Sequence, residues 1–127
     1  MNNPTKVFVV DDSQTIRRSA EVFLTKAGFH VALFENGFDA LAQLSEQKPD
    51  IIFLDVLMPV LDGLQTCQII KRSDQFRDTP IVFLSSKNSE FDRARGRYLG
   101  AVDYLGKPFS RDEIVACVNR LVPRENT

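Results

Sequence analysis

Five short runs of apolar residues recur along the chain, each about as long as a β-strand. They are rich in β-branched side chains and do not alternate with polar residues, which is typical of strands covered on both faces. The runs are Val7–Val10, Val31–Phe34, Ile51–Leu54, Ile81–Leu84 and, more weakly, Ala101–Leu105. The pattern therefore predicts five buried strands.

The segments between and after these runs have apolar residues at helical spacing. The first is a single stripe that ends at Ala27, and Gly28 follows where a helix C-cap is expected. The other four stripes lie in Phe38–Leu44, Leu64–Ile70, Phe91–Leu99 and Ile114–Leu121. Ser110-Arg-Asp-Glu113 opens the last of them as a capping box. Strict alternation of strands and helices predicts a doubly wound α/β fold, with a five-stranded parallel sheet between two layers of helices.

Length and composition narrow the class of protein. The chain has 127 residues, of which 43% are hydrophobic and 26% charged, with a net charge of -1. These values predict one globular domain without the basic field that a nucleic-acid partner would need. Asp55 and Pro59 interrupt the longest apolar stretch and no signal peptide is visible, so we expect no membrane contact and a cytoplasmic location. Cys67 and Cys117 are then expected to be free thiols.

Polar side chains stand at the carboxyl ends of four of the five predicted strands. Asp11-Asp12 follows the first, Asp55 the third, Ser85-Ser86 the fourth and Lys107-Pro108 the fifth. In open α/β sheets the carboxyl ends of the strands meet at one edge, where ligands bind. If these four strands are neighbours, three carboxylates, a hydroxyl and an ammonium converge there. The second strand is expected at the margin of the sheet, away from them.

Each of these residues also has a purely structural interpretation. Asp12 precedes a helix and would serve as its N-cap, Lys107 would form one ion pair with an aspartate, and Ser85 would close a turn. Asp55 is harder to explain, because no helix begins directly after it and a buried carboxylate is costly unless it is paired or metal-bound. The coincidence of all four at equivalent strand ends favours a functional site.

The chemistry of this set points to phosphoryl transfer. Three carboxylates in one cleft repel each other, so one of them takes up a proton unless a cation is present. A few hard oxygen ligands suit Mg²⁺, which keeps several waters and bridges to phosphoryl groups. A carboxylate with Mg²⁺, a lysine and a hydroxyl is what transfer to an aspartate would need. The loop after Asp11 carries two negative charges and no glycine, which argues against a nucleotide pocket.

These motifs resemble the receiver domain of two-component response regulators, over about residues 5–122. The resemblance is carried by Asp11-Asp12-Ser13, Leu54-Asp55-Val-Leu-Met58-Pro59 with Asp62-Gly63, Ser85-Ser86 and Lys107-Pro108-Phe109. It implies a flavodoxin-like sheet of order 2-1-3-4-5 and a single receiver domain over residues 1–127. It also implies a signalling protein that catalyses only its own phosphorylation and dephosphorylation.

The resemblance implies a role for each residue of the acidic cluster. Asp55 would accept the phosphoryl group. Asp11, Asp12, Asp55 and the main-chain carbonyl of Leu57 would form the Mg²⁺ site. Lys107 would contact the phosphoryl group, and its peptide bond to the following proline is expected to be cis.

Further implications of the resemblance concern the signal. Ser85 and Tyr104 match the switch positions, and Ser86 would offer its backbone N–H to the phosphoryl group. A sensor histidine kinase is the expected phosphodonor. Because the chain ends after the fifth helix, the signal is expected to leave by contact with a downstream protein, through the fourth helix, fifth strand and fifth helix. Arg93 and Arg97 on the fourth helix are either a solvated face or part of a surface for an acidic partner.

Three segments are similar to a narrower group, the stand-alone receivers of type IV pilus and twitching-motility systems. They are Gln65–Lys71, Leu84–Arg97 and Asp103–Phe109. A chemotaxis pathway or another two-component pathway is the alternative.

Two other classes of function remain open. A Mg²⁺-dependent phosphohydrolase of the haloacid-dehalogenase kind also forms an aspartyl phosphate. It places its nucleophile in an Asp-x-Asp motif and usually has a cap domain, whereas Asp11 and Asp12 are adjacent here and 127 residues leave no room for a cap. A pseudo-receiver that only binds partners usually lacks an acidic residue or the lysine, and all of them are present here.

Overall fold

The computed structural model describes residues 4–58, 60–86 and 100–123. The helix expected over Phe91–Leu99, with Arg93 and Arg97, lies outside these residues, as does Pro59. The strands are β1 (Lys6–Val10), β2 (His30–Phe34), β3 (Ile51–Asp55), β4 (Ile81–Ser85) and β5 (Asp103–Gly106). The helices within the described ranges are α1 (Gln14–Lys26), α2 (Gly37–Gln47), α3 (Gly63–Lys71) and α5 (Arg111–Leu121).

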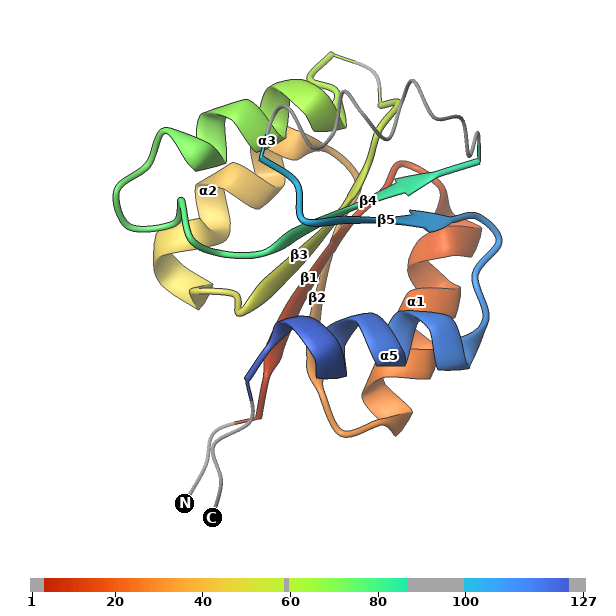
Figure 1. Ribbon diagram of the computed structural model, residues 1–127. Coiled ribbons are helices and arrows are strands. Elements are labelled where there is room, and N and C mark those ends of the chain that lie inside the picture. Colours follow the sequence, from red (N-terminus) through yellow and green to blue (C-terminus); the bar gives the residue numbers. More distant parts are fainter. Residues whose placement is uncertain (1–3, 59, 87–99, 124–127) are drawn as a thin grey trace.

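The five strands form one parallel sheet in the order β2-β1-β3-β4-β5. Helices α1 and α5 cover one face of this sheet, and α2 and α3 cover the other (Figure 1). The predicted doubly wound fold and strand order are therefore confirmed, and β2 lies at the margin as expected.

Consecutive strand residues enter two different hydrophobic cores. Val7 and Val9 of β1 pack in the core that includes residues of α1 and α5, whereas Phe8 and Val10 pack in the core that includes residues of α2 and α3. Every residue of β3 and β4 is buried. This double coverage is the reason why the strand sequences show no alternation of apolar and polar residues.

Helix ends are fixed by polar caps and by one glycine. Ser13 caps α1, because its hydroxyl accepts a backbone N–H of the first turn, so the interpretation of Asp12 as the cap is wrong. Gly28 follows α1 with a φ of 95°, as the glycine stop predicted. The capping box of Ser110 and Glu113 is present at the start of α5. No helix in the described ranges is long and apolar enough to cross a membrane.

The exposure of Phe38 and the start of β5 differ from what the sequence predicts. Phe38, expected within the apolar stripe of α2, is 54% exposed, and α2 buries Ala40 and Leu44 instead. The strand expected from Ala101 begins at Asp103. Ala101 is buried without being part of the strand, so the apolar run there reflects burial rather than strand geometry.

Candidate functional site

The carboxyl ends of β1, β3 and β5 bring together the acidic residues and the lysine predicted from the sequence. Asp11 follows β1 and is completely buried, and Asp55 ends β3 with 4% of its surface exposed. Asp12 is exposed at the mouth of the same cluster. One carboxylate oxygen from each of the three residues lies within 4.8 Å of the others.

Lys107 joins two of these carboxylates. Its Nζ lies 3.0 Å from Oδ2 of Asp11 and 3.2 Å from Oδ1 of Asp55. Its backbone N–H donates to the carbonyl of Ser85 at 2.9 Å, which ties the end of β5 to the end of β4. The peptide bond between Lys107 and Pro108 is cis, as expected. An ion pair between one lysine and one aspartate does not describe this arrangement, because one ammonium pairs with two carboxylates and a third, Asp12, belongs to the same cluster.

The pKa values of the pair reflect this imbalance. Burial, followed by the negative charge of Asp11, raises the pKa of Asp55 from 3.8 to about 7, although Lys107 opposes the shift. Burial also acts on Lys107 and favours its neutral form, but hydrogen bonds and charge from Asp11 and Asp55 outweigh it and raise the pKa of Lys107. The lysine therefore stays charged while Asp55 holds a proton readily.

The donor atoms of the cluster fit a hard divalent cation. Oδ1 of Asp11 accepts the backbone N–H of Ser13 at 2.8 Å, which orients this carboxylate. Oδ1 of Asp55 accepts from Lys107 and from the backbone N–H of Leu57, at 3.2 and 3.3 Å. Carboxylate oxygens beside an exposed Asp12 leave room for the waters that Mg²⁺ retains, so the triad can hold a metal ion.

Gly63 explains why the loop after Asp55 returns so closely to β3. A Cβ at Gly63 would lie 2.0 Å from the carbonyl oxygen of Asp55, so a larger residue would force the two segments apart. The backbone N–H of Gly63 donates to the carbonyl of Val56 at 3.1 Å. A capping box between Asp62 and Gln65 then starts α3. The Asp62-Gly63 motif therefore fixes the position of the strand end that carries Asp55.

Comparison with known proteins settles the family. A family model described as the response regulator receiver domain matches residues 7–119. The chain belongs to the response regulator receiver family. It is a signalling domain and not a conventional enzyme, which removes the phosphohydrolase alternative. A histidine kinase as phosphodonor follows from membership of this family.

Individual relatives of this receiver domain agree with that assignment. Protein PilG of Pseudomonas aeruginosa is 50% identical over 118 residues, which cover 93% of this chain and 87% of PilG. Transcriptional regulatory protein GltR of the same species is 38% identical, and the match covers 96% of this chain but only 50% of GltR. The crystal structure of chemotaxis protein CheY4 of Vibrio cholerae superposes with a TM-score of 0.90 at 32% identity, and covers 94% of this chain and all of that one.

Ser85 and Tyr104 lie on neighbouring strands of the receiver domain. Ser85 is the last residue of β4 and is 6% exposed, and in the strand register it faces Gly106. Tyr104 faces Phe83 in the same register, with the two rings in edge-on contact and their centroids 6.0 Å apart. Tyr104 is partly buried. Ser86, next in the chain, is exposed.

Arg17 is a residue of the receiver site that the sequence analysis missed. Its Nη1 donates to the backbone carbonyl of Asp11 at 2.7 Å, from the first turns of α1. The hydrogen bond holds the junction between β1 and α1, where the two adjacent aspartates lie. The sequence signal, an arginine six positions after Asp11, is too weak to find alone because Arg18 follows directly.

Proposed function

We propose that this receiver domain is a phosphorylation switch, over about residues 5–122, in which Asp55 accepts the phosphoryl group. The observation that carries the proposal is the grouping of Asp11, Asp12 and Asp55, two of which pair with the Lys107 ammonium. One positive charge leaves the cluster negative, so it suits a divalent cation together with a phosphoryl group. The position of Asp55 at the end of β3, beside Lys107 at 3.2 Å, supports Asp55 as the nucleophile.

In the transfer step, a carboxylate oxygen of Asp55 attacks the phosphorus of a phosphohistidine on a sensor histidine kinase. The phosphorus–nitrogen bond breaks, its electron pair returns to the imidazole, and Asp55 becomes an acyl phosphate. Asp11, Asp12, Asp55 and the main-chain carbonyl of Leu57 would hold Mg²⁺, which offsets the charge on the phosphoryl oxygens. Lys107 contacts a phosphoryl oxygen, since its Nζ already lies 3.2 Å from Asp55.

The new phosphoryl group would then act on the neighbouring strand ends. It adds about −1.5 to −2 charges and three strong acceptor oxygens. The Ser85 hydroxyl, at the end of β4, and the backbone N–H of Ser86, the next residue, would donate to these oxygens. Movement of Ser85 changes the packing beside β5, where Tyr104 lies, and shifts the balance between two arrangements of that ring.

The pathway we propose is type IV pilus and twitching-motility signalling in the cytoplasm. The support is the 50% identity with PilG over 93% of the chain, together with the segments that resemble this group of receivers. The likeness to the chemotaxis protein CheY4 is weaker, at 32% identity. The downstream partner would be a protein that binds the surface of the fourth helix, β5 and α5.

Reaction with acetyl phosphate tests the proposal without a kinase. Intact-mass spectrometry should detect one added phosphoryl group with Mg²⁺ present, and none after addition of EDTA or in Asp55→Asn. An unmodified mass in all conditions would indicate a module that only binds partners. An adduct that persists in Asp55→Asn would place the acceptor on another residue.

A further inference from the structure

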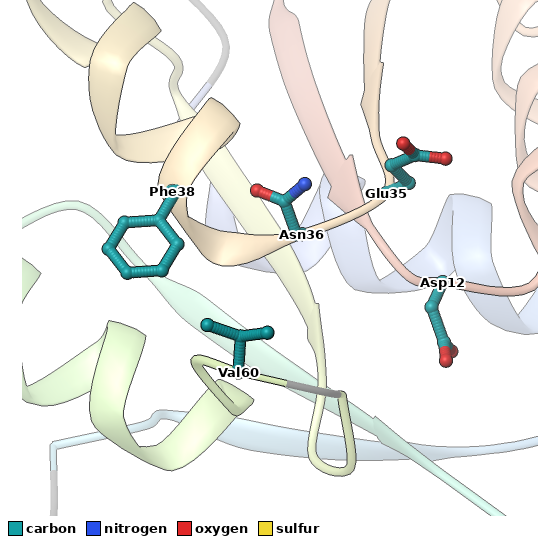
Figure 2. Close-up of a pocket in the computed structure, with 5 residues that line it drawn as sticks. All are labelled: Asp12, Glu35, Asn36, Phe38 and Val60. Atoms are coloured by element: carbon teal, nitrogen blue, oxygen red, sulfur yellow. The ribbon is translucent and has the colours of Figure 1, made fainter.

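Phe38 and Val60 expose large apolar surfaces beside the acidic cluster. Phe38 is 54% exposed at the start of α2, and Val60, in the loop between β3 and α3, is 85% exposed. Together with Asp12, Glu35 and Asn36 they line a hollow of about 280 Å³. Figure 2 shows the Phe38 ring and Val60 on one side of this hollow and the carboxylates of Glu35 and Asp12 on the other.

The backbone of Val60 is strained. Its φ is 70°, in the left-handed region that glycine and asparagine adopt most readily and that is least favourable for a β-branched residue. Burial within this chain does not offset the strain, because most of the side chain is exposed. Residues held in such conformations concentrate at functional sites. A valine in this strained and exposed position is therefore better explained by contact with a partner molecule than by a role in folding.

The segments that carry Phe38 and Val60 are packed closely together. A Cβ at Gly37 would lie 2.2 Å from Oγ1 of Thr66 and 3.1 Å from Cδ2 of Leu61, so the start of α2 touches the start of α3. The Thr66 hydroxyl in turn donates to the carbonyl of Asp62 at 2.9 Å. A partner would find the hollow already formed, which lowers the entropy cost of binding.

The hollow combines apolar walls with negative charge. Its two charged lining residues are Asp12 and Glu35, and no lysine or arginine is among the described residues that line it. Asp12 also belongs to the cluster around Asp55. Any segment that fills the hollow therefore lies next to the phosphoacceptor.

We propose that this hollow docks the protein phosphodonor. An apolar side chain of the donor packs between Phe38 and Val60, and a lysine or arginine beside it pairs with Glu35. A donor fits better than a downstream target, because only the donor has to bring a histidine into contact with Asp55 and so cover the cluster. This inference rests on the proposed function, since it takes Asp55 as the acceptor.

A comparison of two phosphodonors distinguishes an effect on kinase docking from an effect on the phosphorylation of Asp55 itself. Acetyl phosphate reaches Asp55 without a protein surface, whereas an autophosphorylated kinase must dock. The kinase is chosen by testing the histidine kinases of the source organism against the unaltered protein and keeping the fastest donor. The variants are Phe38→Ala, Glu35→Lys and Val60→Asn, which removes the apolar side chain but tolerates the backbone conformation. Ile69→Ala is the matched control, because Ile69 is 45% exposed on α3 and does not line the hollow.

We expect all four variants to react with acetyl phosphate at the unaltered rate. Transfer from the kinase should lose about tenfold in kcat/KM in Phe38→Ala and in Val60→Asn, and little in Ile69→Ala. Glu35→Lys should lose a similar factor at low salt and less at high salt. The proposal would be overturned if the kinase phosphorylated the three hollow variants as fast as the unaltered protein. It would also be overturned if acetyl phosphate labelled the unaltered protein but none of the kinases did. Failure of acetyl phosphate to label the unaltered protein would instead overturn the proposed function.

Discussion

Asp55 is placed where burial and charge act in the same direction. It is 4% exposed and lies beside the fully buried Asp11, so its pKa rises to about 7 in spite of Lys107. The folded chain therefore binds this proton more tightly than the unfolded chain, in which the pKa is near 3.8. The stabilising contribution of the group is complete below pH 3.8 and disappears as the pH rises through 7.

This linkage predicts a pH-dependent effect of Asp55→Asn in metal-free protein. At pH 8 the variant should be more stable than the unaltered protein by about 1–3 kcal/mol, because it removes a buried charge that faces Asp11. The difference should shrink between pH 7 and pH 5, as Asp55 of the unaltered protein takes up its proton. Urea unfolding with EDTA at pH 5 and pH 8 measures it. An equal difference at both pH values would show that Asp55 does not titrate in this range.

Lys107 is predicted to accelerate phosphorylation without being required for it. Asp55 carries out the attack, and Lys107 only offsets charge on a phosphoryl oxygen. Lys107→Ala should therefore still gain one phosphoryl group from acetyl phosphate, at a rate lower by roughly tenfold to a hundredfold. Time courses of intact mass provide the measurement, with Lys107→Arg as a variant that keeps the charge. A rate equal to that of the unaltered protein would remove Lys107 from the reaction.

At the scale of elements, the junction between β1 and α1 sets the geometry of the acidic cluster. Arg17 bonds the carbonyl of Asp11, and Ser13 both caps α1 and donates its N–H to the Asp11 side chain. Hydrogen bonds from the Arg17 side chain and from the Ser13 backbone therefore link the start of α1 to Asp11, which directly follows β1. The positions of Asp11 and Asp12 therefore depend on these hydrogen bonds as well as on the contacts of their own side chains.

Arg17→Met tests this junction. Loss of the hydrogen bond to the Asp11 carbonyl should lower the free energy of unfolding by about 1 kcal/mol. It should also raise the Mg²⁺ concentration needed for half-maximal labelling by acetyl phosphate a few-fold, because the carboxylates are held less firmly. Arg18→Met on the same helix is the control, since Arg18 is exposed. Equal Mg²⁺ requirements in the two variants would mean that Arg17 has no positioning role.

The elements that could be predicted from the sequence are those in which the local pattern of apolar residues matches the burial of the same residues in the fold. The buried strands were found because both faces of the sheet are covered, so burial and local sequence carry the same signal. Phe38 has helical spacing but faces outward, since α2 turns Ala40 and Leu44 toward the core instead. The cap at Ser13 was missed because Asp12 is an equally good capping residue in isolation. Val60 could not be predicted, because its conformation depends on how its loop closes.

For the whole molecule, the position of the site at the carboxyl ends of the strands decides which elements can respond to phosphorylation of Asp55. This edge of the sheet joins two helical layers, and Ser85 lies there on the strand next to β5. Tyr104 packs against Phe83 within the core on the α2 and α3 side. A change at Asp55 can therefore reach β5 by two routes, through Ser85 at the end of β4 and through Lys107, which directly follows β5 and lies 3.2 Å from Asp55.

This arrangement predicts that Ser85 and Tyr104 are coupled. Tyr104→Trp gives a fluorescent reporter in a chain that has no tryptophan. Beryllofluoride, which stands in for the phosphoryl group, should shift its emission with Mg²⁺ present. The shift should be much smaller when Ser85→Ala or Lys107→Ala is added, because the ring then loses its link to Asp55. Equal shifts with and without Ser85→Ala would mean that the signal leaves by another route.

The separation of Lys107 from its partners along the chain has a consequence for folding. The lysine is 96 positions from Asp11 and 52 from Asp55. Contacts this distant in sequence form late, because the intervening chain must first be ordered. An intermediate with β1 and β3 in place but β5 undocked would hold two buried carboxylates without their ammonium. Docking of β5 brings the ammonium to these carboxylates and removes that electrostatic penalty, so the charge of the cluster itself favours completion of the sheet.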